Sequence, residues 1–230
     1  MKKSNKLLLV GFLTGLLLIT AIHVSLYAKY KAGNYTIYNA EEDLKRQSLH
    51  TFPNILFVSL RNVPEGTVRF GDVAKMEKGD EDIVYVQKGD TLLISGTDSL
   101  GSRNIDYPVT FHLPYNATLS VVNSFLSFRG GKKMAESTPV IYLQKSQALF
   151  SGTETPLRFG HLKVVASDSS AVMFHGNTQV SNLEVQLSTS SIEYNGGDFG
   201  QLSITTDSAS HISLQSKHLL KAAIKTLAPD

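Results

Sequence analysis

A degenerate repeat in the C-terminal half of the chain constrains its fold more than any other feature. Its signature is an apolar residue, any residue, an aromatic residue, any residue and glycine. The first four copies keep this pattern, whereas the fifth has lost both the ring and the glycine. The copies begin at Leu126, Ala148, Val172, Ile192 and Ile212, which are 22, 24, 20 and 20 residues apart. A period of this length is typical of a solenoid, in which each unit stacks on its neighbours.

A second alternating element precedes three of these signatures. It occupies Leu162–Ala166, Leu183–Leu187 and Leu202–Thr206, with apolar residues at every other position. This alternation directs one face of a strand into a core. Short runs of Ser, Thr and Asp separate the two elements and favour turns. Each unit is therefore predicted as a strand, a polar corner, a second strand, a glycine corner with a left-handed glycine and a connecting leg.

Stacking of these units predicts an all-β fold, a right-handed parallel β-helix. The aligned units place Leu162, Leu183 and Leu202 in one buried column. A second column contains Phe128, Phe150, Phe174, Tyr194 and Leu214. The alternative is an antiparallel β-sandwich, which also has short strands between turns. The regular period and the matching columns favour the solenoid.

The N-terminus predicts a membrane anchor. Lysines occur at positions 2, 3 and 6, and residues 7–28 follow without a formal charge on Asp, Glu, Lys or Arg. Twenty-two residues of helix are long enough to cross a hydrocarbon core of about 30 Å. A cleaved signal peptide is the alternative, but Leu26 stands where a cut after Ala28 needs a small residue. We expect residues 1–6 to be cytoplasmic, because the basic end favours that side.

Two further predictions concern the N-terminal half. Gly11 and Gly15 form a small-xxx-small pair, through which two membrane helices can approach closely. A short helix is expected over Asn39–His50, inside a juxtamembrane linker at 29–51, because Asn39 can cap it. An extracytoplasmic domain then fills 52–230. Its expected parts are a meandering β cap at 52–106 and coils at 107–228.

Period-two patterns locate the strands of the expected cap. They cover Ile55–Leu60, Thr67–Phe70, Lys75–Lys78, Ile83–Gln87 and Thr91–Ser95. At the other end, Lys217–Leu227 has the composition of a helix. The repeat register instead aligns Ala222–Thr226 with Leu202–Thr206, so a final strand is expected there.

Composition and motifs exclude several classes of function. The net charge is only +2 and no basic cluster is interleaved with aromatic residues, so nucleic-acid binding is not expected. The chain has no cysteine, which excludes disulfides, thiolate metal sites and a cysteine nucleophile. No phosphate-binding loop, dinucleotide fingerprint, metalloprotease motif or nucleophile elbow occurs. We expect no metal, no cofactor and no catalytic residue.

The best candidate binding site is the stacked polar corner, which offers hydroxyls and carboxylates to a glycan or a cation. Its proposed ligand-facing members are Ser167, Asp168, Ser170, Ser188, Ser190, Asp207 and Ser208. The structural alternative is a column of turn residues that satisfy backbone groups at the corner. Asp168 and Asp207 would lie two coils apart, near the spacing of an inverting glycosidase, but out of register by one position.

The segment from Met76 to Ile94, with its Lys-Gly-Asp turns, precedes coils rich in Ser, Asp and Gly. In this respect Phe52–Thr226 resembles the autotransporter adhesin head (GIN) domain family, which is common in Bacteroidetes. The resemblance implies a right-handed β-helix that is exported or attached to a membrane. It carries over no catalytic signature, and we expect no outer-membrane barrel after the coils.

These observations together predict a non-catalytic binding or scaffolding module of the cell envelope. Residues 7–28 would hold it in the inner membrane as a single-pass protein, with its bulk in the periplasm. A glycan or an envelope protein would be its partner. The alternatives are a polysaccharide-processing enzyme on the same fold and a purely structural component of an envelope assembly.

Overall fold

The structure is a computed structural model that describes residues 3–31, 49–77, 83–96, 109–130 and 138–226. The chain forms two units, Met1–Asp43 and Leu44–Asp230. Most of the helix expected over Asn39–His50 lies outside the described residues. The end of that expected helix is instead the start of strand β1 (Leu49–Phe52).

The first unit contains one helix, α1 (Lys3–Lys31), which is longer than the predicted 7–28. Within it, the 20 residues Val10–Lys29 are long and apolar enough to cross a membrane. Signal sequences near an N-terminus share these properties. Along the described part of α1, large apolar side chains such as Leu17 and Val24 are exposed. The helix therefore has the lipid-compatible surface that the sequence predicts.

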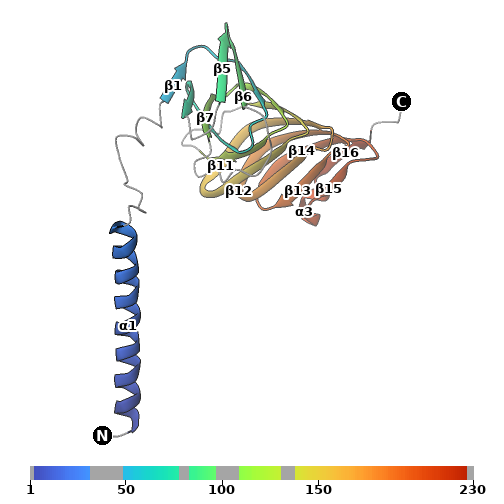
Figure 1. Ribbon diagram of the computed structural model, residues 1–230. Coiled ribbons are helices and arrows are strands. Elements are labelled where there is room, and N and C mark those ends of the chain that lie inside the picture. The colour runs from blue at the N-terminus through green and yellow to red at the C-terminus, as the bar shows by residue number, and fades with distance from the viewer. Residues whose placement is uncertain (1–2, 32–48, 78–82, 97–108, 131–137, 227–230) are drawn as a thin grey trace. The chain divides into compact units, whose positions relative to one another are not determined.

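The second unit is a β-solenoid, as predicted, and its strands form two long parallel columns (Figure 1). In spatial order, the first column contains β6 (Thr91–Gly96), β2 (Phe57–Arg61), β8 (Thr118–Val122), β10 (Val140–Gln144), the C-terminal parts of β11 (Gln147–Ser167) and β12 (Ala171–Ser188), β14 (Asp198–Thr206) and β16 (Ala222–Thr226). The second column contains β7 (Val109–Pro114), β3 (Gly66–Gly71), β9 (Phe125–Arg129), the N-terminal parts of β11 and β12, β13 (Ser191–Asn195) and β15 (His211–Ser213).

The register of these columns confirms the core that the repeat predicts. Phe150 pairs with Phe128 on one side and with Phe174 on the other, and all three are fully buried. Their rings stack face to face, with centroids 4.6 and 4.8 Å apart. Leu183 likewise lies between Leu162 and Leu202. Phe128, Phe150 and Phe174 therefore form one stack along the column, and Tyr194 follows Phe174 in register but packs edge to face on Phe199.

The glycine corner differs in part from the prediction. Gly176 has a left-handed backbone, with φ of +62°, as expected. Gly152 pairs with it in register but is not left-handed. A Cβ at Gly152 would lie 2.1 Å from the carbonyl oxygen of Asn177, so here glycine is needed because the next coil's backbone approaches closely.

The N-terminal end of the solenoid is not built in chain order. The coil formed by β2 and β3 lies between the coil of β6 and β7 and the coil of β8 and β9. Antiparallel strands complete this end: β5 (Ile83–Lys88) on β6, and β4 (Ala74–Glu77) on β7 with β1 on β4. Parallel pairing thus already begins in β2, inside the segment 52–106 that was expected to be a cap. The expected boundary between this cap and the coils at 107–228 therefore does not coincide with a change from antiparallel to parallel pairing.

The C-terminal end contains both elements that the sequence left open. A one-turn helix, α3 (Ser216–Leu219), precedes the strand β16. In β16, Ala222, Ile224 and Thr226 pair with Leu202, Ile204 and Thr206, which is the predicted register. The final strand is therefore confirmed.

His218 of α3 ends the stack of core rings. Its imidazole is buried against Tyr194 and Phe199, with ring centroids 4.6 and 5.1 Å away. Burial lowers the pKa of His218, and the charges of Lys217 and Lys221 act in the same direction against the opposing effect of Asp198. The neutral imidazole is therefore the form that fits this end of the core.

Candidate functional site

A ladder of serines runs through the polar corners, one from each of five successive coils. Each serine hydroxyl accepts a hydrogen bond from a backbone N–H of the preceding coil. The bonds join Val63 to Ser124 (2.9 Å), Ser124 to Ser146 (3.2 Å), Ser146 to Ser170 (3.1 Å), Ser170 to Ser190 (3.3 Å) and Ser190 to Ser210 (3.1 Å). The hydroxyls thereby satisfy N–H groups that the two strand columns leave without a partner at the bend.

The same hydroxyls also donate to acceptors in their own corner. Ser146 donates to the carbonyl of Gln144 at 2.7 Å, and Ser190 donates to the carbonyl of Ser188 at 2.8 Å. Ser124, Ser146, Ser170 and Ser190 are at most 6 % exposed. Each is used in both its donor and acceptor roles, so the ladder links adjacent coils inside the protein.

The structure separates the seven residues predicted to face a ligand. Ser170 and Ser190 do not face solvent, because they belong to the buried ladder. Asp168, Ser188 and Ser208 are exposed, while Ser167 and Asp207 are half-buried. The prediction that these five contact a ligand stays a prediction. The contacts of the two buried serines agree instead with the structural alternative, in which turn residues satisfy backbone groups at the corner.

The two corner carboxylates are engaged by different neighbours. Asp168 accepts a hydrogen bond of 2.7 Å from the side-chain amide of Gln144. Asp207 accepts from the hydroxyl of Ser210 (2.6 Å) and from the backbone N–H groups of Thr189 (2.8 Å) and Ala209 (3.2 Å). These bonds, led by that of Ser210, lower the pKa of Asp207. This stabilises the ionised form, which is unsuited to a general acid.

An exposed apolar surface lies on the outer side of the first column, at its N-terminal end. We call it the apolar outer face. It consists of Phe57, Val84, Val86, Leu93 and Tyr142, which are 39–59 % exposed. Val86 and Leu93 are directly opposite each other on paired strands. The alternating residues Val58, Leu92 and Ile141 are buried, which fixes the outward direction of this face.

Sequence reasoning found only one member of the apolar outer face. In the sequence, Tyr142 stands between the apolar Ile141 and Leu143, so strand alternation predicts that its side chain is exposed, and it is 45 % exposed. The other four give no comparable signal, because an apolar residue in a short strand is usually expected to face a core. The available signal was the run Ile83-Val-Tyr-Val86, in which no polar residue alternates with the apolar ones.

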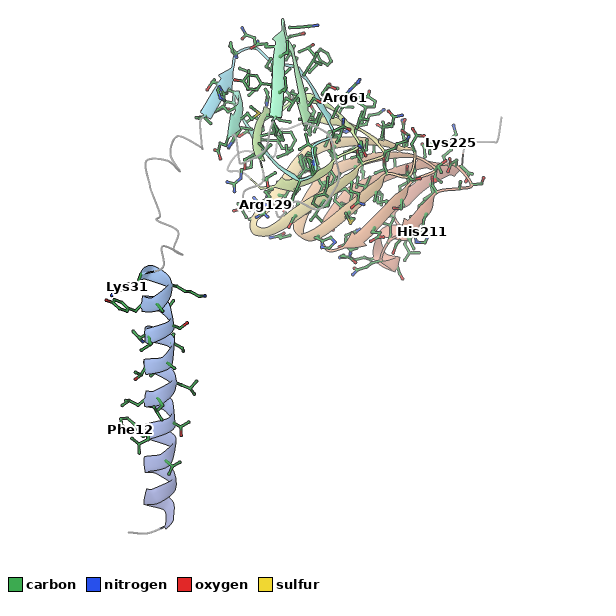
Figure 2. The ribbon with its side chains drawn as sticks, viewed as in Figure 1. Phe12, Lys31, Arg61, Arg129, His211 and Lys225 are labelled. Atoms are coloured by element: carbon green, nitrogen blue, oxygen red, sulfur yellow. The ribbon has the colours of Figure 1, made fainter. Side chains whose placement is uncertain are left out.

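The outer side of the first column becomes polar toward its C-terminal end. Lys163 and Glu184 form an ion pair of 2.7 Å there, and this bond lowers the pKa of Glu184. Ser203 and Thr205 continue the same rows on β14. Arg61 on β2 and Lys225 on β16 are labelled near the two ends of the column (Figure 2). On the outward-facing side of the first column, the large exposed apolar side chains of the described strands therefore lie in its N-terminal part.

The remaining predicted sites receive no ligand geometry from the structure. Within the ranges it describes, no group of three or more His, Asp or Glu side chains could hold a metal ion. On α1, a Cβ added at Gly11 or Gly15 would have no atom within 4 Å, so both positions lie open. Their role in helix association stays a prediction.

Comparison with known proteins gives little further information. No protein family matches the sequence. No curated protein matches it either. A crystal structure of a "putative cell adhesion protein" from Clostridium sporogenes aligns with 78 % of this chain and 93 % of its own, at 9 % identity and a TM-score of 0.26. A TM-score this low supports no conclusion about shared fold or function.

Proposed function

We propose that this protein is a non-catalytic binding or scaffolding module of the cell envelope, and that it binds an envelope protein through the apolar outer face. Val84 and Val86 are 59 % and 47 % exposed on a strand, where an isolated domain normally places polar residues. Val86 and Leu93 are directly paired, and Phe57 lies on the strand next to Leu93. Exposed apolar side chains gathered in this way mark interaction sites. This surface is the single observation that carries the proposal.

The chemistry of the face favours a protein partner over a glycan. Three of its five members are aliphatic, and aliphatic side chains offer no hydrogen bonds to sugar hydroxyls. Only Phe57 and Tyr142 supply rings. A partner that buries Val84, Val86 and Leu93 gains about 25 cal/mol for each Å² of apolar surface removed from water.

Anchoring belongs to the same proposal. In it, α1 stays in the inner membrane with residues 1–6 in the cytoplasm, and the solenoid lies in the periplasm. The apolar length of Val10–Lys29 supports this arrangement. The resemblance to the autotransporter adhesin head (GIN) domain family supports export. A protease added outside spheroplasts would then digest the solenoid but leave a protected N-terminal fragment.

Crosslinking in intact cells tests the binding surface. A photoreactive residue at position 88, on the same strand, would capture a partner in the otherwise wild-type chain. The variant Val86→Lys should abolish capture, because burying a lysine on an apolar interface is costly. Ser203→Lys is the matched control, since it adds the same charge at the polar end of the sheet. Recovery of the protein alone, or equal capture by Val86→Lys, would contradict the proposal.

The enzyme alternative has its own test. Cleavage of any member of a glycan panel by the wild-type protein, lost in Asp168→Asn or Asp207→Asn, would establish polysaccharide processing. If the protein instead bound a glycan without cleaving it, and Phe57→Ala lost this binding, the partner would be a sugar rather than a protein.

A further inference from the structure

The buried core of the solenoid continues unfinished into its last described strand. Ile224 in β16 pairs in parallel register with Ile204 in β14, so both side chains occupy the core-facing side of the first column. Ile204 is 0 % exposed, whereas Ile224 is 47 % exposed. Ile224 therefore lies next to the buried core on one side, while its other side is exposed to solvent.

The two ends of the solenoid are closed differently. At the N-terminal end, antiparallel strands β5, β4 and β1 extend beyond the parallel coils. At the C-terminal end, α3 covers the ring stack through His218. Leu219 and Leu220, at the junction of α3 and β16, are 43 % and 88 % exposed. Apolar surface is thus uncovered beside β16 but not beside the ring stack.

The backbone of β16 is also open on one edge. Among the strands that the structure describes, β16 pairs only with β14. Its other edge therefore presents N–H and C=O groups that can extend the sheet. An open strand edge next to exposed core-facing side chains is the surface to which another strand can add.

We propose that a second copy of this chain occupies this end, with the two β16 strands paired antiparallel about a two-fold axis through Ile224. In this register, Ala222 lies opposite Thr226 of the copy and Ala223 lies opposite Lys225 of the copy. Ile224 meets its own equivalent on the core-facing side. No two lysines are directly opposite each other, so the strand is compatible with itself in charge as well as in facing.

The pairing completes what the single chain leaves uncovered. Ile224 of each copy closes the core of the other, and the inner N–H and C=O groups of both edges gain partners. The dimer joins two solenoids end to end. It uses the surface farthest along the columns from the apolar outer face, and it does not depend on the proposed partner binding.

Disulfide crosslinking of the full chain tests the register, because the native sequence has no cysteine. In the proposed dimer, opposite Cα atoms lie about 4.5–5.5 Å apart, within the range of a disulfide. Ile224→Cys should therefore crosslink most of the detergent-solubilised protein under mild oxidation. Ala222→Cys is the matched control, since its two equivalents would be separated by four residues, or about 13 Å.

A double variant tests the same register independently of Ile224. Ala222→Cys combined with Thr226→Cys should crosslink through two equivalent bonds, although neither single variant does. Ile224→Lys should shift the chain from dimer to monomer in sedimentation experiments, with an unchanged circular dichroism spectrum. Crosslinking of Ile224→Cys at the level of Ala222→Cys, or no gain in the double variant over its singles, would overturn the proposal.

Discussion

The serine ladder predicts a specific loss of stability when a single hydroxyl is removed. In Ser146→Ala, the backbone N–H of Ser124 loses its acceptor at 3.2 Å. The carbonyl of Gln144 loses one donor but keeps another, the N–H of Asn123 at 3.0 Å. Ser124 is only 5 % exposed, so its N–H is left without a partner away from water. An orphaned buried group of this kind costs about 1–3 kcal/mol.

Chemical unfolding of the full chain in detergent measures this loss. The midpoint should fall with an unchanged dependence on denaturant concentration, because the change removes only the hydrogen bonds of one hydroxyl and leaves the fold intact. On heating, a loss of about 2 kcal/mol corresponds to roughly 4–8 °C for a domain of this size. Ser203→Ala is the control: it removes an exposed hydroxyl from the same sheet and should change stability by less than about 0.5 kcal/mol. If Ser146→Ala were no more destabilising than Ser203→Ala, the ladder would not stabilise the corner.

Three further predictions concern the core, the close backbone contact and the buried histidine. Phe150→Ala should cost about 3–5 kcal/mol in chemical unfolding, because it empties the centre of the ring stack; a loss below that of Ser146→Ala would contradict the stacking. Gly152→Ala should lower the melting temperature more than Gly71→Ala, since only the first Cβ meets backbone, at 2.1 Å, whereas the second has no atom within 4 Å. For His218, the folded-state pKa is lowered, so the unfolded chain binds protons more readily and stability is lost as the pH falls below about 6.5. His218→Leu should lack this loss between pH 7.5 and 5.5, and an identical pH dependence in both proteins would refute the assignment.

The core of the C-terminal coils was predictable because a local pattern specifies it. An apolar residue at every second position, a ring at a fixed place and a period near 20 residues determine which side chains stack. Phe150 could therefore be paired with Phe128 and Phe174 from spacing alone. The serine ladder had an equally regular signal, since a serine stands two residues before the first apolar residue of every signature. Its burial was missed because the turn composition of the corner suggested exposure.

The N-terminal coils could not be predicted in the same way. Their strands carry no signature that distinguishes one neighbour from another, and β2 pairs with strands formed much later in the chain. The apolar outer face was missed for a related reason: alternation identifies two faces of a strand, but Ile83–Val86 is apolar on both. Which face is buried depends on β6, which is a property of the tertiary fold.

The interleaved position of β2 and β3 also determines the order in which the solenoid can assemble as the chain is synthesised. The N–H of Val63 bonds to Ser124, 61 residues away, whereas Ser170 bonds to Ser190 only 20 residues away. The first coil formed by the chain must therefore wait, with both of its apolar edges open, until β6 to β9 have arrived on either side. After that point, each later coil can pack on a coil that has already folded, because its partner lies only about one repeat earlier in the sequence. Closing such short loops costs less entropy than closing long ones. The slow step in assembling this protein is thus expected near its N-terminal coils, and those are the strands that a chaperone would have to protect.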